Sequence, residues 1–193
     1  MEPNHPIYEP TPCKRVLARA GDRDTLEPRY MEPLSTPVTG KLAKAHVEQH
    51  VAFLTDPKGA LPLGQGKEWL KQFPTNPGVY CIFEGKDLIY SGETGSLKGR
   101  MRDLLDTRNH TLRRQLGNTK FGKHPGYRAA SSRVKFPDDI EKLLTEFMLT
   151  HLKVKASPVP LGRKEIEEKL IDERSPKYNT KGRRGEVSDE ARL

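Results

Sequence analysis

Two tyrosines lie ten positions apart in a stretch of strand-forming composition, GVYCIFEGKDLIYSG at residues 78–92. Tyr80 and Tyr90 each end a short run of residues that favour β-strands, and glycine separates the runs, which predicts a β-hairpin. Pairing Phe83 with Leu88 leaves the two phenols on opposite faces of the hairpin. A three-residue turn instead places them opposite each other on one face, and the sequence does not choose between the two registers.

Positive charge gathers directly after this hairpin. Residues 98–135 contain eleven Lys and Arg side chains and only two Asp, within a chain of 193 residues and net charge +8. A basic run is usually a solvated face. This one is too long for one helix face and interrupts a patterned core, so it favours phosphate binding.

Other chemistry-bearing residues carry weaker signals. His46 and His50 are one helical turn apart, a spacing that suits a metal ion, but no third ligand is recognisable and we expect ordinary surface histidines. Cys13 and Cys81 form neither a disulfide framework nor a zinc pattern. Without a signal peptide or an apolar run long enough for a bilayer, the sequence predicts a cytoplasmic protein with no membrane partner.

The helices and strands that must position these residues are predicted from the spacing of apolar residues and from the Gly, Pro and Ser residues that begin or end such elements. A proline-rich arm precedes the first amphipathic helix, and basic helices follow the hairpin. The expected elements are an extended or partly disordered arm over 1–40, a helix over 41–54, a loop over 56–66, a helix from Ser96, a short helix from Thr111 ended by Gly117, a helix over 136–149, a strand over 151–159 and a helix over 161–173.

Four motifs together resemble the GIY-YIG nuclease superfamily. They are Gly78-Val79-Tyr80, Tyr90-Ser91-Gly92, SLKGRM around Arg100 and EEKLIDERSPKYN from Glu167 to Asn179. The resemblance implies an α+β fold in which helices flank a small three-stranded antiparallel sheet. We expect an arm over 1–40, a helical N-terminal extension over 41–77, the nuclease domain over 78–180 with a basic helical insertion at about 106–150, and a tail over 181–193.

The resemblance also implies a role for each matched residue in hydrolysing a phosphodiester. Glu167 is expected to hold one Mg²⁺ or Mn²⁺ ion, which commonly takes its other ligands from water and phosphate. Arg100 clamps a phosphoryl oxygen. Tyr80 orients or deprotonates the attacking water, Tyr90 helps to position it, and Asn179 braces the site. A phenol is a poor base at neutral pH, so nearby cations must assist it.

The chain departs from compact family members between Arg100 and Glu167, where the basic insertion lies. His110 in this insertion is a further catalytic candidate, and the alternatives are contact with phosphate or capping of the following helix. Hypothetically the insertion forms a DNA-contacting subdomain. The residues expected to contact DNA are Lys98, Arg102, Arg108, Arg113, Arg114, Lys120 and Lys123.

The leading hypothesis is a metal-dependent DNA endonuclease of restriction or mobile-element type. One site cuts one strand, so a homodimer on DNA is expected for a double-strand cut. The alternatives are a structure-specific DNA repair nuclease, a catalytically inactive nucleic-acid-binding module and an RNA-associated basic protein.

Overall fold

The computed structural model describes residues 40–179. The predicted arm, apart from Gly40, and the predicted tail over 181–193 lie outside the described residues. The elements in chain order are α1 Lys41–Thr55, β1 Leu61–Pro62, α2 Gly66–Leu70, β2 Gly78–Glu84, β3 Asp87–Thr94, α3 Leu97–Asp103, α4 Thr111–Phe121, α5 Asp138–His151, β4 Leu152–Pro158 and α6 Arg163–Arg174.

The sheet is antiparallel and has four strands in the order β1-β4-β2-β3, so the expectation of three strands is wrong. The additional strand is β1, in a segment expected to be a loop, where Leu61 pairs with Val154 and Pro62 with Lys153. A two-residue strand has no periodicity to detect. Its proline also reads as a loop signal, although proline is tolerated at a sheet edge such as this one.

A β-bulge in the β2–β3 hairpin resolves the question of its register. Phe83 pairs with Leu88, but the register shifts between Ile82 and Phe83, so Ile82 pairs with Tyr90 and Tyr80 with Gly92. Neither register weighed from the sequence therefore holds along the whole hairpin. Because the bulge inserts one residue into β3, it turns both tyrosines to the same face of the sheet.

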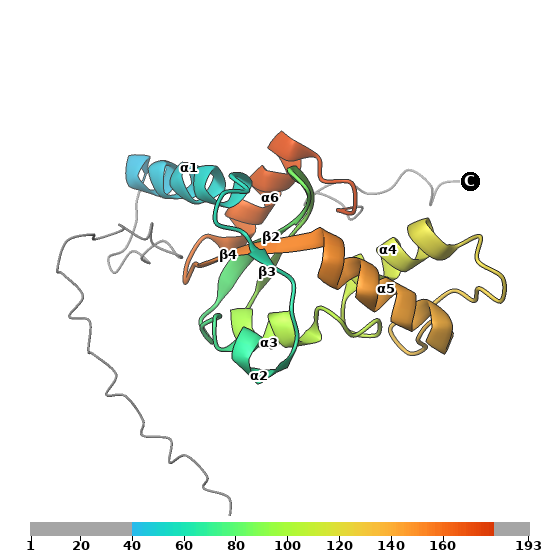
Figure 1. Ribbon diagram of the computed structural model, residues 1–193. Helices are drawn as coiled ribbons and strands as arrows, with labels where there is room; N and C mark the ends of the chain where they lie inside the picture. Colours follow the sequence, from blue (N-terminus) through green and yellow to red (C-terminus); the bar gives the residue numbers. More distant parts are fainter. Residues whose placement is uncertain (1–39, 180–193) are drawn as a thin grey trace, which may run out of the picture.

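Helices cover the two faces of the sheet separately (Figure 1). On one face, Val79, Cys81 and Phe83 of β2 belong to an apolar core that also contains residues of α1 and α6, such as Leu54 and Ile166. α1 therefore shares a core with the predicted nuclease domain. The other face carries Tyr80 and Ile82, which belong to a second core completed by α3, α4 and α5. The candidate chemistry thus lies on the side built by the basic insertion.

Two expectations about local structure are wrong. Helix α4 continues through Gly117 to Phe121, so this glycine does not end the helix. The glycine instead allows close packing, because a Cβ at position 117 would collide with the Phe136 ring. His46 and His50 are buried rather than on the surface, with 9% and 0% of their area exposed. His50 faces the sheet from α1, where the Oγ of Ser157 in β4 lies 3.1 Å from its Nδ1, and His46 packs edge-on against His50.

In the described part of the chain, residues 40–179, no helix has the length and apolar character needed to cross a membrane.

Candidate active site

The two phenols meet above the hairpin. The ring centroids of Tyr80 and Tyr90 are 6.1 Å apart, and the two rings are tilted by 36° to each other. Tyr80 is 1% exposed, whereas Tyr90 is partly exposed. Gly92 makes this arrangement possible, since a Cβ there would lie 2.7 Å from the Tyr80 hydroxyl oxygen. The glycine of the second motif is therefore required by the Tyr80 ring lying across it.

His110 joins the phenols from the insertion. The Tyr80 hydroxyl lies 2.8 Å from Nε2 of His110, and the His110 and Tyr90 ring centroids are 5.5 Å apart. His110 occupies the position before α4 but its side chain caps no N–H of that helix. The imidazole is 1% exposed, and its Nδ1 has no hydrogen-bond partner within residues 40–179.

Burial sets the protonation of these three rings. It lowers the pKa of His110 to about 3, with further contributions from the charges of Arg100 and Arg114, so the imidazole is neutral at neutral pH. Burial also raises the pKa of Tyr80 well above its usual value, and the neighbouring Tyr90 adds to this shift. The pKa of Tyr90 is raised by burial first and then by the charge of Glu167. Without substrate, therefore, both phenols keep their protons.

Arg100 brings positive charge to the same place. It lies on α3, whose first turn is capped by Ser96: the Gly99 N–H donates to the Ser96 side chain over 3.2 Å, as expected for a helix starting near this serine. The Nε of Arg100 is buried and has no acceptor among the described residues. A buried guanidinium N–H without an acceptor is costly unless a ligand supplies one, and an anionic phosphoryl oxygen fits this need.

Glu167 approaches from α6, beside the end of β3. Its carboxylate accepts a hydrogen bond from the main-chain N–H of Glu93, and its charge reaches both phenols. The pKa of Glu167 is raised, first by burial and then by the negative charge of Glu93. Arg163 holds the Glu93 side chain through an Nε to Oε2 distance of 3.0 Å. Two carboxylates that repel each other are a site where a cation would be stabilising.

The carboxylates of Glu167 and Glu93 suit the divalent ion that the resemblance implies. Across residues 40–179, no group of three or more His, Cys, Asp or Glu side chains is placed to hold a metal ion. Mg²⁺ does not require such a cage, because it keeps several waters and takes oxygen ligands from one or two carboxylates and substrate phosphate. Glu167, with Glu93 beside it, offers the hard oxygen donors that this mode of binding uses.

Asn179 is fixed to the sheet edge next to the phenols. Its side-chain carbonyl accepts the Ser91 N–H and its side-chain N–H₂ donates to the Ser91 carbonyl, both over 2.8 Å. The main-chain N–H of Tyr178 donates to the Ile89 carbonyl over 3.0 Å. The segment after α6 therefore lies against β3 and holds the strand that carries Tyr90.

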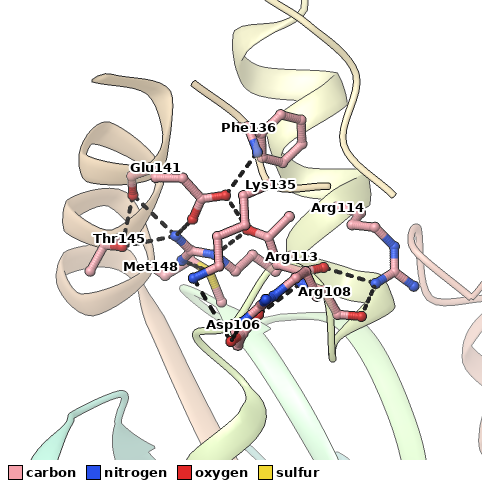
Figure 2. A network of polar contacts seen from close by, with 10 residues as sticks. Asp106, Arg108, Arg113, Arg114, Lys135, Phe136, Glu141, Thr145 and Met148 are labelled. Atoms are coloured by element: carbon pink, nitrogen blue, oxygen red, sulfur yellow. Dashed lines mark hydrogen bonds and ion pairs between the residues drawn. The ribbon is translucent and has the colours of Figure 1, made fainter. Parts of the chain in front are cut away.

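Among the residues expected to contact DNA, Arg113 is wrongly assigned. It is 1% exposed, and one of its terminal nitrogens lies 2.7 Å from the Glu141 carboxylate, so no phosphate can reach it (Figure 2). Arg114 is partly buried against the loop that precedes α4, and Lys120 forms an ion pair with Glu84 over 2.9 Å.

The remaining four expected DNA-contacting residues keep side chains at the surface. Arg102, Arg108 and Lys123 are exposed, and Lys98 is partly exposed. Arg102 and Arg108 contact Asp103 and Asp106, over 3.5 and 3.4 Å, through exposed ion pairs that solvent weakens. These four residues therefore stay available to a phosphate backbone.

Sequence reasoning missed three residues of this region. Glu93 directly follows the second glycine motif, and that adjacency was the available signal. Thr107 and Glu141 hold Arg113, as Figure 2 shows for Glu141, but they lie 34 positions apart in the chain and no local pattern connects them.

Comparison with known families identifies the class of protein. A sequence model described as the GIY-YIG catalytic domain matches residues 70–192. The chain belongs to this family and is a nuclease, a hydrolase of phosphodiester bonds, and membership implies DNA endonuclease activity. No curated protein matches the chain.

The solved structures with some similarity include crystal structures of a bacterial endonuclease domain. The N-terminal GIY-YIG endonuclease domain of UvrC from Thermotoga maritima, bound to its catalytic magnesium ion, is 20% identical, covers 59% of this chain and 99% of that chain, and gives a TM-score of 0.34. A point mutant of that domain, bound to the catalytic divalent cation, is 18% identical, covers 60% and 100%, and gives 0.33.

Proposed function

We propose that the chain is a divalent-cation-dependent DNA endonuclease whose active site combines Tyr80, Tyr90, Arg100, His110 and Glu167. The observation that carries this proposal is the 2.8 Å contact between the buried Tyr80 hydroxyl and Nε2 of His110. A phenol with a usual pKa near 10 removes few protons from water at neutral pH. A neutral imidazole on the far side of the phenol gives the proton somewhere to go.

Burial decides which phenol meets the water in this proposal. The sequence favoured Tyr80, but Tyr80 is 1% exposed and Tyr90 is partly exposed, which supports Tyr90 as the solvent-facing group. As the water oxygen bonds to phosphorus, one water proton passes to the Tyr90 oxygen. Tyr90 gives its own proton to Tyr80, and Tyr80 gives its proton to Nε2 of His110. The ester P–O bond breaks, and its electron pair leaves with the departing oxygen, which solvent protonates.

The charged residues prepare the phosphate for this step. Arg100 donates to a non-bridging phosphoryl oxygen. Burial is the first cause of the low pKa of His110 and the charges of Arg100 and Arg114 come second, so a phosphate bound to Arg100 offsets only that second contribution. Asn179 keeps the Tyr90 strand in place. Glu167, with Glu93 nearby, would hold Mg²⁺ or Mn²⁺, which when bound supplies positive charge at the scissile phosphate and makes the attacking water more acidic.

DNA is the partner that this surface suits. Lys98, Arg102, Arg108 and Lys123 are available for non-specific contacts along a phosphate backbone. One site hydrolyses one strand, so a restriction or mobile-element role calls for a homodimer on duplex DNA, and a monomer that nicks suits a repair role. A cytoplasmic location remains a prediction.

The experiment compares cleavage of supercoiled and branched DNA by the purified full chain with Mg²⁺, with EDTA, and after Glu167→Ala. We expect both removals to abolish cleavage and to leave DNA binding measurable. Glu165→Ala, which removes an exposed carboxylate from the same helix, is the matched control and should cleave normally.

The outcomes separate the possible roles. Discrete fragments from duplex DNA would indicate a restriction or mobile-element enzyme, and preference for the branched substrate would indicate repair. Tight binding without cleavage under every metal condition would contradict the proposal and leave a binding module. Cleavage that persists in EDTA would contradict its cation requirement.

A further inference from the structure

The loop that delivers His110 to the tyrosines is held by a buried arginine (Figure 2). Arg113 donates from Nε to the Thr107 hydroxyl over 2.9 Å. Its Nη2 donates to the Glu141 carboxylate over 2.7 Å and to the Thr145 hydroxyl over 2.9 Å. The Thr107 hydroxyl in turn donates to the other Glu141 oxygen over 2.5 Å. One guanidinium therefore connects the loop before α4 to helix α5.

Thr107 is also held from its other side. Arg114 donates from Nη1 to the main-chain carbonyl of Thr107 over 2.8 Å and to that of Arg108 over 3.0 Å. The His110 N–H then donates to the Asp106 carbonyl over 3.1 Å, which closes a tight turn. Two consecutive arginines thus fix the main chain immediately before His110.

This arrangement exceeds what joining two helices requires. Burying a guanidinium is costly, and apolar residues of similar volume often join helices as well or better. A planar guanidinium differs in holding several acceptors in a fixed geometry. The imidazole needs such precision, because its Nδ1 has no hydrogen-bond partner in the described part of the chain and the contact with Tyr80 is its one side-chain hydrogen bond there.

We propose that Arg113 and Glu141 are positioning residues that keep Nε2 of His110 within hydrogen-bond distance of the Tyr80 hydroxyl. The inference deepens the proposed function and rests on it for the role of His110. Neither residue touches substrate, since Arg113 is 1% exposed and Glu141 faces it from α5. Their effect on cleavage passes through the histidine.

The test is a double-mutant cycle on DNA cleavage by the full chain. Arg113→Lys keeps the charge but cannot reach Thr107, Glu141 and Thr145 together, and Glu141→Gln removes the ion pair. We expect either change to lower kcat about tenfold to a hundredfold, as for a small misplacement of a catalytic group, with KM for DNA little changed. In a His110→Gln background the same changes should lower kcat no further.

A separate readout follows the histidine without catalysis. In isotope-labelled full chain, NMR titration should show His110 neutral down to about pH 3, and Arg113→Lys should move its pKa towards the ordinary value near 6.5 as the ring loosens. This measurement remains informative if no cleavage is found, so a failure of the proposed function is distinguishable from a failure of the positioning role.

Two further variants guard against a folding artefact. Thr107→Val removes the two hydrogen bonds that the Thr107 hydroxyl makes with Arg113 and Glu141 but keeps the Arg113–Glu141 ion pair, and it should show a smaller loss of kcat with the same dependence on His110. Tyr127→Phe removes a 2.7 Å hydrogen bond to Asn118 towards the other end of α4 and should leave kcat unchanged. Equal losses with and without His110, or wild-type kcat and His110 titration in the Arg113 variants, would overturn the proposal.

Discussion

His50 and His110 lie buried on opposite faces of the same sheet, and they share most physical features. They are 0% and 1% exposed, each contacts one hydroxyl group, and each leaves its second ring nitrogen without a partner inside the described range. Burial, first among the causes, lowers the pKa of His50 to about 4 and that of His110 to about 3. Burial and a lowered pKa therefore do not distinguish a catalytic histidine from a structural one.

Their surroundings differ. His50 contacts Ser157 and packs edge-on against His46, on the face of the sheet that also carries the apolar core of α1 and α6. His110 contacts a phenol, and Arg100 and Arg114 contribute to its lowered pKa. Ser157 is fully buried, whereas Tyr80 lies beside the more exposed Tyr90, with ring centroids 6.1 Å apart. The partner hydroxyl and nearby cations, rather than burial, separate the two roles.

The largest difference in kcat should appear when each histidine is exchanged in turn for glutamine, which keeps hydrogen bonding but accepts no proton. His110→Gln should lower kcat by about 10²- to 10⁴-fold, the usual contribution of general acid–base catalysis. His50→Gln should leave kcat unchanged. Single-turnover cleavage at saturating DNA measures both, and equal losses in the two variants would remove the distinction between the faces.

His50 should contribute to the stability of the fold, although it does not contribute to cleavage. His50→Ala leaves a cavity on the α1 side and removes the partner of Ser157, so we expect the free energy of unfolding to fall by about 2 kcal/mol. Urea denaturation measures this change. Gln49→Ala, at the adjacent exposed position of α1, serves as the control, and an equally small loss at both positions would contradict a structural role for His50.

Acid should weaken both faces in the same direction. Each buried histidine binds its proton less readily in the folded than in the unfolded chain, so stability is complete above pH 6.5 and declines as pH falls towards 4 for His50. The slope is about 1.4 kcal/mol per pH unit for each such group. Urea midpoints between pH 7 and 4.5 should show a shallower decline in His50→Leu, and an unchanged slope would exclude His50 as a contributor.

The smallest effects should come from the surface cations that accompany the His110 face. Arg108→Ala and Lys123→Ala should each reduce the dependence of log binding constant on log salt concentration by about 0.9 for each phosphate that the side chain neutralises. Lys44→Ala removes an exposed cation from α1, on the His50 side of the sheet, and should not change this slope. Fluorescence anisotropy with a short duplex across a salt series makes the comparison, and equal changes on both faces would argue against a localised DNA surface.

Short-range patterns predicted the hairpin, most helices and the family, because strand composition, helical spacing and the motif residues are local properties. The bulge that turns both phenols to one face was not predictable, since it depends on how β3 packs rather than on the turn itself. The burial of Arg113 was not predictable for the same reason. Arg113 lies in a basic run that is typical of phosphate binding, and its partner Glu141 is 28 positions later in the chain. His50 was misassigned because the apolar partners that bury it lie in distant segments.

The hydrogen bonds between Asn179 and Ser91 also bear on assembly. They occupy main-chain groups of β3, the outer strand of the sheet, that would otherwise be open to a strand from another molecule. At the opposite edge, Pro62 in β1 cannot donate a main-chain hydrogen bond. Each edge thus carries a feature that disfavours pairing with another strand, so contacts through helices or loops suit two copies that meet on DNA better than a continuous sheet does.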